Sequence, residues 1–461
     1  MSAPSLAAPR HAAGIAWVTT ATSFGFALIQ LDVTIVNVAL PRIAVDLRTD
    51  IAGLQWVVDA YALAFAVLLL SGGLLADRLG AKRLYLAGLA VFAATSALCA
   101  LSVSAATLIG ARALQGVGAA LMLPTSLALL NHAAAGDRAV RARAVGWWTA
   151  AGSITIAAGP IIGGALLALA GWRSIFWVNL PVCALGAWLT LRVCPAPRDS
   201  ERRGFDLPGQ LLAIVALTSL TASVIEAHGN PYRPLVLAGL ALALTSAFTF
   251  VRVEARARVP MLPLALFRQR GFSVAIVYGV AVNLTYYGIV FVLTLYLQRI
   301  MGYTALQTGL AYLPLTATFF IVNVASGAVV TRFGVRGPMV VGALVDACGF
   351  ALLSALGPSS SYLWMLPAFA LLPLGMGTGV PAMTTSVLSS VDASQAGVAS
   401  AALNAARQAG GAIGVALFGG LAGDGVDRVV EGLHHSAYVS ITLLAGAAVL
   451  AYVALRAAQR R

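Results

Sequence analysis

Residues 31–41 read LDVTIVNVALP and place an acidic side chain, Asp32, inside an apolar segment that runs from about residue 14 to residue 40. A helix of that length can cross about 30 Å of hydrocarbon. A carboxylate in the middle of a spanning helix costs roughly 2.5–3.5 kcal/mol on insertion scales. An acid retained at that cost indicates a functional site, and the handling of protons or cations is the first candidate.

The composition extends this interpretation to the whole chain. Of 461 residues, 60% are hydrophobic and 10% are charged, whereas soluble domains carry about 25% charged residues. We therefore predict an all-α polytopic membrane protein. Its 14 transmembrane helices are expected near residues 14–38, 52–72, 84–102, 105–130, 144–168, 174–193, 208–227, 234–251, 272–297, 306–330, 338–357, 363–388, 396–422 and 437–455.

The basic residues predict the orientation of these helices. The net charge is +13, and with the N-terminus inside, 21 of the 29 Lys and Arg residues fall on the inner side and six on the outer side. Arg112 and Arg407 remain within spans. An inner excess of this size predicts that both termini are cytoplasmic in a multi-pass protein of the inner, cytoplasmic membrane. The positive charge is thus a topology signal, and no nucleic-acid partner is expected.

An internal repeat indicates how the spans are grouped. Residues 73–82 read GLLADRLGAK after span 2, and residues 327–336 read GAVVTRFGVR after span 10, with glycine, arginine, glycine and a final base at matching offsets. Parallel six-span repeats are one of two repeat patterns of transporters. We expect a six-helix bundle in residues 1–194, cytoplasmic linkers with an inserted transmembrane hairpin in residues 195–271, and a second six-helix bundle in residues 272–461.

Several further segments carry a resemblance to a known family. They are residues 31–41 and 72–83, LIGARALQGVG at 108–118, the glycine-rich residues 152–164, WRSIFWVNLP at 172–181, and NAARQ at 404–408 followed by Gly410, Gly411 and Gly414. Together they resemble the major facilitator superfamily, within it the 14-span drug:proton antiporters, and among these the exporters of the methylenomycin-resistance type. The resemblance implies the major facilitator fold and export from the cytoplasm driven by proton entry, with no cofactor beyond the proton motive force.

Three charged residues are the candidate proton-coupling site. Asp32, Asp59 of span 2 and Arg112 of span 4 all fall about 10–14 Å below the outer surface, from the helix rise of about 1.5 Å per residue. In the family's fold spans 1, 2 and 4 belong to one bundle, so we expect one charged cluster. Either acid is a candidate proton carrier. The alternative is that an acid is a packing group paired permanently with Arg112.

Two further motifs receive roles through the resemblance. The loop after span 2 is the expected inner gate, with Gly73, Asp77, Arg78, Gly80 and Lys82 as its residues; for Lys82, positive-inside anchoring is an equal alternative. Thr331 replaces Asp77 in the repeat, so we expect asymmetric gating. Span 5 carries the expected antiporter motif at the interface between bundles, formed by Gly152, Gly159, Pro160, Gly163 and Gly164. Small residues at this spacing let helices approach closely.

The remaining candidates are a second ionic site and a substrate cavity. Asp346 of span 11 and Arg407 of span 13 are intramembrane charges, and Asp346 is either a second proton site or half of a structural ion pair. Aromatic, methionine and amide groups suit amphipathic organic molecules. The expected cavity residues are Asn37, Gln115, Asn283, Tyr286, Tyr287, Phe319, Asn323, Met376 and Asn404.

These features favour a proton-coupled antiporter that exports amphipathic drugs or antibiotics by alternating access. One alternative is a proton-coupled transporter of an endogenous metabolite, and another is a membrane sensor or scaffold that transports nothing. An enzyme is not expected, because no nucleophile and base stand out as a pair. No spacing of ligands indicates a metal site. We expect a monomer whose partners are the substrate, protons and membrane lipid.

Overall fold

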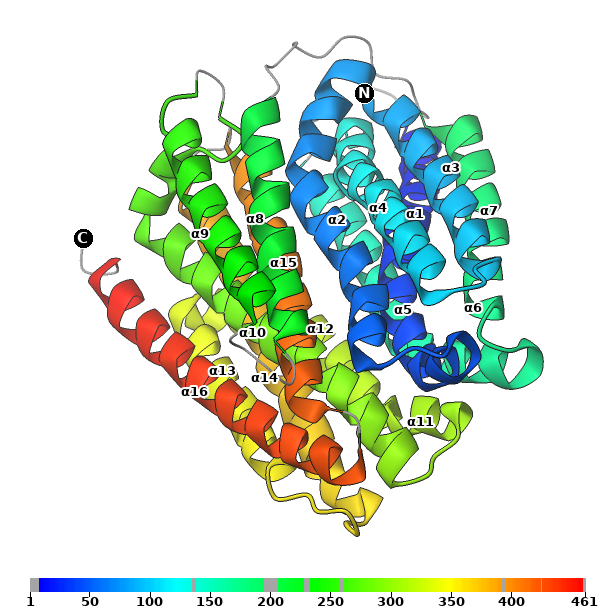
Figure 1. Cartoon of the computed structure of the whole chain (residues 1–461). Helices are drawn as coiled ribbons and strands as arrows, with labels where there is room; N and C mark the ends of the chain where they lie inside the picture. Colours follow the sequence, from blue (N-terminus) through cyan, green and yellow to red (C-terminus); the bar gives the residue numbers. More distant parts are fainter. Residues whose placement is uncertain are drawn as a thin grey trace, which may run out of the picture.

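The computed structural model describes residues 8–134, 138–194, 206–227, 233–257, 260–391, 395–423 and 425–458. Within these ranges the chain forms helices and short connections and contains no strand. The fold is therefore all-α, as the composition predicts. Figure 1 shows the long helices running roughly alongside one another in two groups, with the N-terminal helices in blue and cyan.

The first group of helices is formed by the N-terminal part of the chain, in which α4 packs against α1, α2 and α3, and α7 packs against α1 and α3. Its members are α1 (Ala8–Leu47), α2 (Ile51–Leu79), α3 (Ala81–Ala100), α4 (Ala105–Ala133), α5 (Arg138–Ala170), α6 (Ser174–Trp177) and α7 (Asn179–Val193). Local sequence explains where α4 begins, because the Ser104 side chain accepts a hydrogen bond from the Thr107 N–H and Thr107 bonds back to Ser104. Such a reciprocal cap satisfies two N–H groups that a helix start leaves free.

The second group contains the C-terminal half of the chain. Its members are η1 (Leu264–Arg268), α10 (Arg270–Leu295), η2 (Tyr296–Ile300), α11 (Ala305–Ala311), α12 (Leu313–Phe333), α13 (Arg336–Leu353), η3 (Tyr362–Met365), α14 (Leu366–Ser389), α15 (Ala396–Ala422) and α16 (Val426–Ala458). Within the group α10 packs against α15 and α16, and α13 packs against α14 and α16. The proposed division of the chain at residues 195 and 272 remains a prediction.

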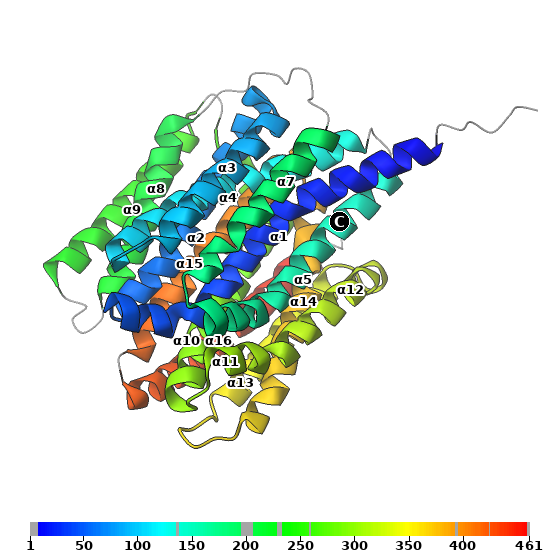
Figure 2. The ribbon, with the colours of Figure 1, turned by 90° about the vertical axis from the view of Figure 1, so that its right-hand side faces the viewer.

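Between the two groups in the sequence lies a helical hairpin, α8 (Leu207–Glu226) and α9 (Pro234–Glu254). The two helices pack on each other, and α8 also contacts α2 of the first group and α15 of the second. Figure 2 places the hairpin at one flank of the molecule. One interaction that holds it is the Gln210 side chain, whose Nε2 donates to the Val67 carbonyl at 2.6 Å and whose Oε1 accepts from the Ser71 hydroxyl.

All fourteen predicted spans fall on helices, but fewer meet a hydropathy criterion for crossing a membrane. Among the described residues twelve helices are long and apolar enough, and a thirteenth span results if α5, bent by 42° between Arg143–Ile156 and Ala158–Ala170, is taken as one. The helix that does not qualify is α15, which carries Asn404, Arg407 and Gln408. A count of fourteen spans and the cytoplasmic placement of the termini therefore remain predictions.

The two repeated loops form similar turns. Gly80 lies between α2 and α3 with φ of +88°, and Gly334 lies between α12 and α13 with φ of +68°. Each glycine donates its N–H back to the preceding helix, Gly80 to Ala76 and Gly334 to Val330. A side chain is strained at these φ values. This explains why glycine occurs at the same offset in both repeats.

A second glycine, Gly72, permits the close approach of α2 and α4. A Cβ atom added there would collide with the carbonyl oxygen of Ala120 on α4. We expect Gly72→Ala to destabilise the protein by about 1–3 kcal/mol, because a rigid backbone atom must move. Thermal unfolding of the purified protein in detergent, followed by tryptophan fluorescence, measures the effect.

Gly110→Ala is the matched control, since no atom lies within 4 Å of a Cβ added at that position on α4. There alanine should be neutral or stabilising by up to about 1 kcal/mol through helix propensity. Equal melting temperatures for the two variants would contradict the packing argument.

Candidate functional site

The centre of the first bundle is a buried ion pair between α1 and α4. The Arg112 guanidinium donates to the Asp32 carboxylate, and both side chains are at most 1% exposed. Arg112 also donates to the Val57 carbonyl on α2 at 3.1 Å through Nε and to the Gln115 side chain at 2.8 Å. The guanidinium thus has partners on α1, α2 and α4, as a charge inside a membrane requires.

Asp32 receives further hydrogen bonds from two amide side chains. Gln115 donates to its Oδ1 at 3.0 Å and Asn179 donates to the same oxygen at 3.3 Å. Both amides also donate to the Ser96 hydroxyl on α3, at 3.3 and 2.9 Å. Together with Arg112, these groups satisfy both carboxylate oxygens of Asp32 and hold it in a network that joins α1, α3, α4 and α7.

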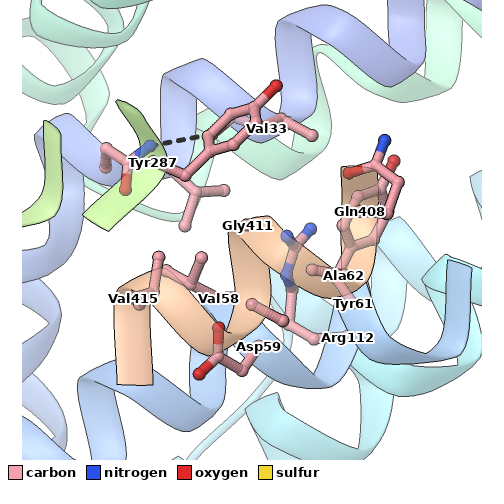
Figure 3. Close-up of a pocket in the computed structure, with 13 residues that line it drawn as sticks. Val33, Val58, Asp59, Tyr61, Ala62, Arg112, Tyr287, Gln408, Gly411 and Val415 are labelled. Carbon is pink, nitrogen blue, oxygen red and sulfur yellow. Dashed lines mark hydrogen bonds between the residues drawn. The ribbon is translucent and has the colours of Figure 1, made fainter. Parts of the chain in front are cut away.

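Asp59 stands in contrast to Asp32. Its side chain is fully buried, and neither carboxylate oxygen has a hydrogen-bond partner in the described part of the chain. It lines a narrow cavity of about 20 Å³ together with residues of α1, α2, α4, α10 and α15. Figure 3 shows the Asp59 carboxylate and the Arg112 guanidinium on the wall of this cavity, with Tyr287 of α10 above them. That volume has room for about one water molecule.

The predicted three-residue cluster is therefore present in part. Asp32 and Arg112 are bonded, and Arg112 and Asp59 line the same cavity. Among the described residues, however, Asp59 makes no ion pair within 4 Å. The ring of Tyr61 lies 4.3 Å from the guanidinium carbon of Arg112, a cation–π distance. Equal depth along the helices indicated proximity, but it could not indicate which acid the arginine faces.

Two glutamine side chains join the bundles directly. Gln55 of α2 is buried, and its Nε2 donates to the carbonyls of Val415 and Ala416 on α15, at 2.9 and 2.6 Å. A Cβ added at Gly419 would lie 2.5 Å from this nitrogen. Gln298 of η2 donates to the Val38 carbonyl on α1 at 3.0 Å. All these residues lie toward the ends of helices that the charge distribution predicts to face outward.

The glycine-rich face of α5 lies between α1 and α11. On one side, a Cβ at Gly159 would collide with the Thr34 hydroxyl, and one at Gly163 would lie 2.8 Å from Ile35. On the other side, a Cβ at Gly164 would lie 2.7 Å from the Leu306 backbone of α11. Gly152 faces Phe26, and Pro160 contacts Gly309 of α11. Close packing of small residues therefore joins α5 to both bundles.

A comparison with known families decides where this architecture belongs. The model of the Major Facilitator Superfamily matches residues 22–415. The chain belongs to the Major Facilitator Superfamily. A solved structure of similar fold is the nucleoside transporter NupG, with a TM-score of 0.66 over 95% of this chain and 99% of that one, at 14% sequence identity. Membership of this superfamily makes the protein a membrane transporter and supports the expectation that it is not an enzyme.

Two curated relatives are much nearer in sequence. The methylenomycin A resistance protein of Bacillus subtilis (strain 168) is 38% identical over 401 residues, which cover 86% of this chain and 85% of that protein. The tetracenomycin C resistance and export protein of Streptomyces glaucescens is 36% identical over 414 residues, which cover 88% and 76% of the two chains. The family resemblance recognised in the sequence is thereby confirmed.

The residues expected at the inner gate of this facilitator are placed as follows. Gly80 forms the turn between α2 and α3, and Gly73 lies on α2 with Pro124 3.9 Å from a Cβ added there. Lys82 donates to the carbonyls of Leu191 and Cys194 at the end of α7, within the same bundle. Arg78 is exposed, and the side chain of Asp77 lies outside the described residues. Their gating role remains a prediction.

Asp346 and Arg407, the predicted second ionic site, form no ion pair with each other. Asp346 of α13 is 3% exposed and lies against Gly375 of α14. The described residues contain two ion pairs, and neither includes Asp346 or Arg407. Arg407 lies beside Gly279 of α10, and its Nε is buried without a hydrogen-bond partner in the described ranges. No ion-pair partner for Asp346 is found among the described residues. Its two interpretations, a second proton site and half of a structural ion pair, both remain predictions.

The expected cavity residues divide into two sets. Asn37, Tyr286 and Tyr287 line narrow cavities between the bundles, and Phe319 stacks on Tyr286 with ring centroids 6.4 Å apart. The others have different surroundings: Gln115 bonds Asp32, Asn283 and Met376 are buried in the second bundle, and Asn323 and Asn404 donate to carbonyls of their own helices.

The prediction from the sequence did not include some residues of the site. Asn179, Ser96 and Tyr61 surround the ion pair, and Gln408 lines the cavity beside Asp59. Asn179 lies in the segment WRSIFWVNLP, where an amide among apolar residues was a usable signal. Ser96 and Tyr61 are ordinary components of membrane helices, so no pattern distinguishes them.

Removing Arg112 tests the ion pair. Arg112→Ala leaves Asp32 as an uncompensated buried charge, so we expect a loss of about 3–5 kcal/mol in stability. The double variant Asp32→Asn/Arg112→Gln removes both charges and should be more stable than Arg112→Ala. Detergent-solubilised protein and thermal unfolding give the comparison.

Arg42→Ala is the control, because Arg42 pairs with Asp46 at 3.0 Å while its side chain is 61% exposed. Such a surface pair is worth at most about 1 kcal/mol. If Arg112→Ala cost no more than Arg42→Ala, the central pair would not be a main support of the bundle.

Proposed function

We propose that this facilitator is a proton-coupled antiporter that exports amphipathic drugs or antibiotics from the cytoplasm. The observation that carries the proposal is the buried carboxylate of Asp59, which has no hydrogen-bond partner among the described residues and lies in a cavity lined by both bundles. Relatives named for antibiotic resistance and for export support the direction and the class of substrate. The protein would act in the cytoplasmic membrane, with the proton motive force as its energy source.

Asp59 is the better candidate for the proton carrier. Asp32 already has an arginine and two amides as donors, whereas Asp59 has none among the described residues. A buried carboxylate without a partner is costly, and binding a proton or an organic cation removes that cost. Proton and cation would compete for this carboxylate, and such competition is what couples export to proton entry in an antiporter.

The contacts between bundles support alternating access. Gln55 and Gln298 and the glycines of α5 join the two halves at the ends predicted to face outward. Opening toward the outside would require these hydrogen bonds to break while the bundles move as units around the cavity. The arrangement thus corresponds to a state in which the outer side is closed.

The cavity walls favour amphipathic and cationic substrates. Tyr286 and Tyr287 lie edge to face with ring centroids 5.4 Å apart, and Asn37 lines both narrow cavities. Aromatic faces attract organic cations, and an adjacent carboxylate adds to that attraction. Substrates larger than a water molecule would require the bundles to separate.

Neutralising Asp59 tests the mechanism. We expect Asp59→Asn to reduce proton-driven transport by at least about tenfold, because the amide cannot bind and release a proton. Inverted membrane vesicles from an efflux-deficient bacterial host provide the assay. Ethidium and methylenomycin A are the first compounds, and proton release on adding each compound is followed with a pH-sensitive dye.

Exchange of labelled for unlabelled ethidium without a proton gradient should persist in Asp59→Asn at raised ethidium concentration, because this reaction needs no net proton transfer and the Tyr286 and Tyr287 rings remain to bind the cation more weakly. Glu226→Gln, a change at an exposed carboxylate at the end of α8, is the matched control and should transport normally. Wild-type proton release by Asp59→Asn would overturn the assignment of the proton site. Absence of transport for every compound tested with the unaltered protein would overturn drug export itself.

A further inference from the structure

The inserted hairpin borders a second cavity. It has a volume of about 280 Å³ and lies between the hairpin, α2, α10, α15 and the connection that precedes α10. This volume is near the lower end of small-molecule pockets, about 300–1,000 Å³. None of its lining residues also lines the Asp59 cavity. The two sites are therefore distinct.

The lining of the hairpin cavity is apolar throughout. Leu217 of α8, Phe250 of α9, Met261 and Phe267 of the connection and Ile276 of α10 contribute large side chains. The α15 wall consists of alanines, at positions 402, 405, 406 and 409. No lining residue carries a charge or a side-chain hydrogen-bonding group. An occupant must therefore be a hydrocarbon group, and a membrane supplies acyl chains at high concentration.

Exposed arginines surround one end of the hairpin and of the connection that precedes α10. The charge distribution predicts that this end faces the cytoplasm. Arg252 and Arg256 lie at the end of α9, and Arg268 and Arg270 lie where α10 begins; all four are exposed. Arg268 directly follows Phe267, a residue of the cavity wall. Exposed arginines at the cytoplasmic surface attract the phosphate groups of anionic lipids.

The acidic side chains near these four arginines are buried and do not lie at the basic surface. Asp206 is 9% exposed and accepts from the Gly209 N–H at 2.9 Å as the cap of α8. Glu254 is 3% exposed and accepts from the Leu262 N–H at 3.3 Å. Both carboxylates are turned into the protein while the arginines face outward. The described surface thus presents positive charge beside an apolar cavity.

We propose that this cavity and its arginines form a binding site for an anionic phospholipid of the cytoplasmic leaflet. One acyl chain occupies the space between the hairpin and the two bundles, and Arg268 and Arg270 bind the phosphate. The site gives the hairpin a function, since α8 contacts α2 of one bundle and α15 of the other. A lipid bound there lies between the hairpin and a helix of each bundle.

Native mass spectrometry of the full-length protein tests the site, with phosphatidylglycerol and phosphatidylcholine as probes. The unaltered protein should retain one phosphatidylglycerol in preference to phosphatidylcholine. Arg268→Gln/Arg270→Gln should weaken phosphatidylglycerol binding by about 30-fold, because each variant position loses the attraction of one arginine for the lipid phosphate. Arg83→Gln/Arg332→Gln removes the same charge from exposed positions elsewhere on the predicted inner side and should not weaken it.

Filling the cavity tests where the acyl chain lies. Ala216→Phe, with Ala213→Leu as a milder second variant, should abolish retention of phosphatidylglycerol, because both alanines line the cavity. Ala241→Phe, on an exposed position of α9, is the control. Retention by both filled variants, or equal binding of the two lipids, would overturn the proposal.

A third result would identify a different occupant. If Ala216→Phe kept its lipid but lost ethidium transport, the cavity would belong to the transported compound and the lipid site would be refuted. Because lipid retention is measured without transport, failure of this proposal is distinguishable from failure of drug export.

Discussion

The ion pair of Asp32 and Arg112 is the constraint around which the first bundle is arranged. A single charge buried in hydrocarbon is expensive, and the expense falls only when every donor and acceptor finds a partner. Here the partners come from α1, α2, α3, α4 and α7, through Val57, Ser96, Gln115 and Asn179. Helices that must all present a polar group to one point have little freedom to shift past one another.

The same pair explains the isolation of Asp59. Arg112 is used by Asp32, Gln115 and Val57, and the Tyr61 ring lies over its guanidinium. Asp59 therefore lines a cavity shared by both bundles without a bonded partner among the described residues. Two acids of the same type and similar depth thus have different chemistry, because one guanidinium serves one carboxylate. Asp32 is thereby built into the hydrogen-bond network of the bundle, whereas Asp59 has no bonded partner among the described residues.

The sequence alone predicted the helical fold, the positions of the long helices and the family, because hydrophobic segments and signature motifs are local features. It also predicted that Asp32 and Arg112 meet. It could not show that Asp59 has no bonded partner in the described part of the chain, since the direction of a side chain around its helix depends on tertiary packing. For the same reason Gln115 was expected in the substrate cavity but bonds Asp32, and Asn179 was overlooked. Whether α15 is a fourteenth span remains a prediction, because its polar residues Asn404, Arg407 and Gln408 lower its hydropathy below the criterion.

The hydrogen bonds of Gln55 have a consequence for sequence variation. Its amide donates to the backbone carbonyl oxygens of Val415 and Ala416. Any residue at those two positions supplies such an oxygen. The facing surface of α15 can therefore accumulate substitutions, for instance as relatives diverge toward different substrates, without losing this connection. The restriction falls instead on Gly419, where a side chain would occupy the space of the amide. A contact of this kind depends on the backbone of α15 and on one glycine, and it tolerates changes in the other side chains of that surface.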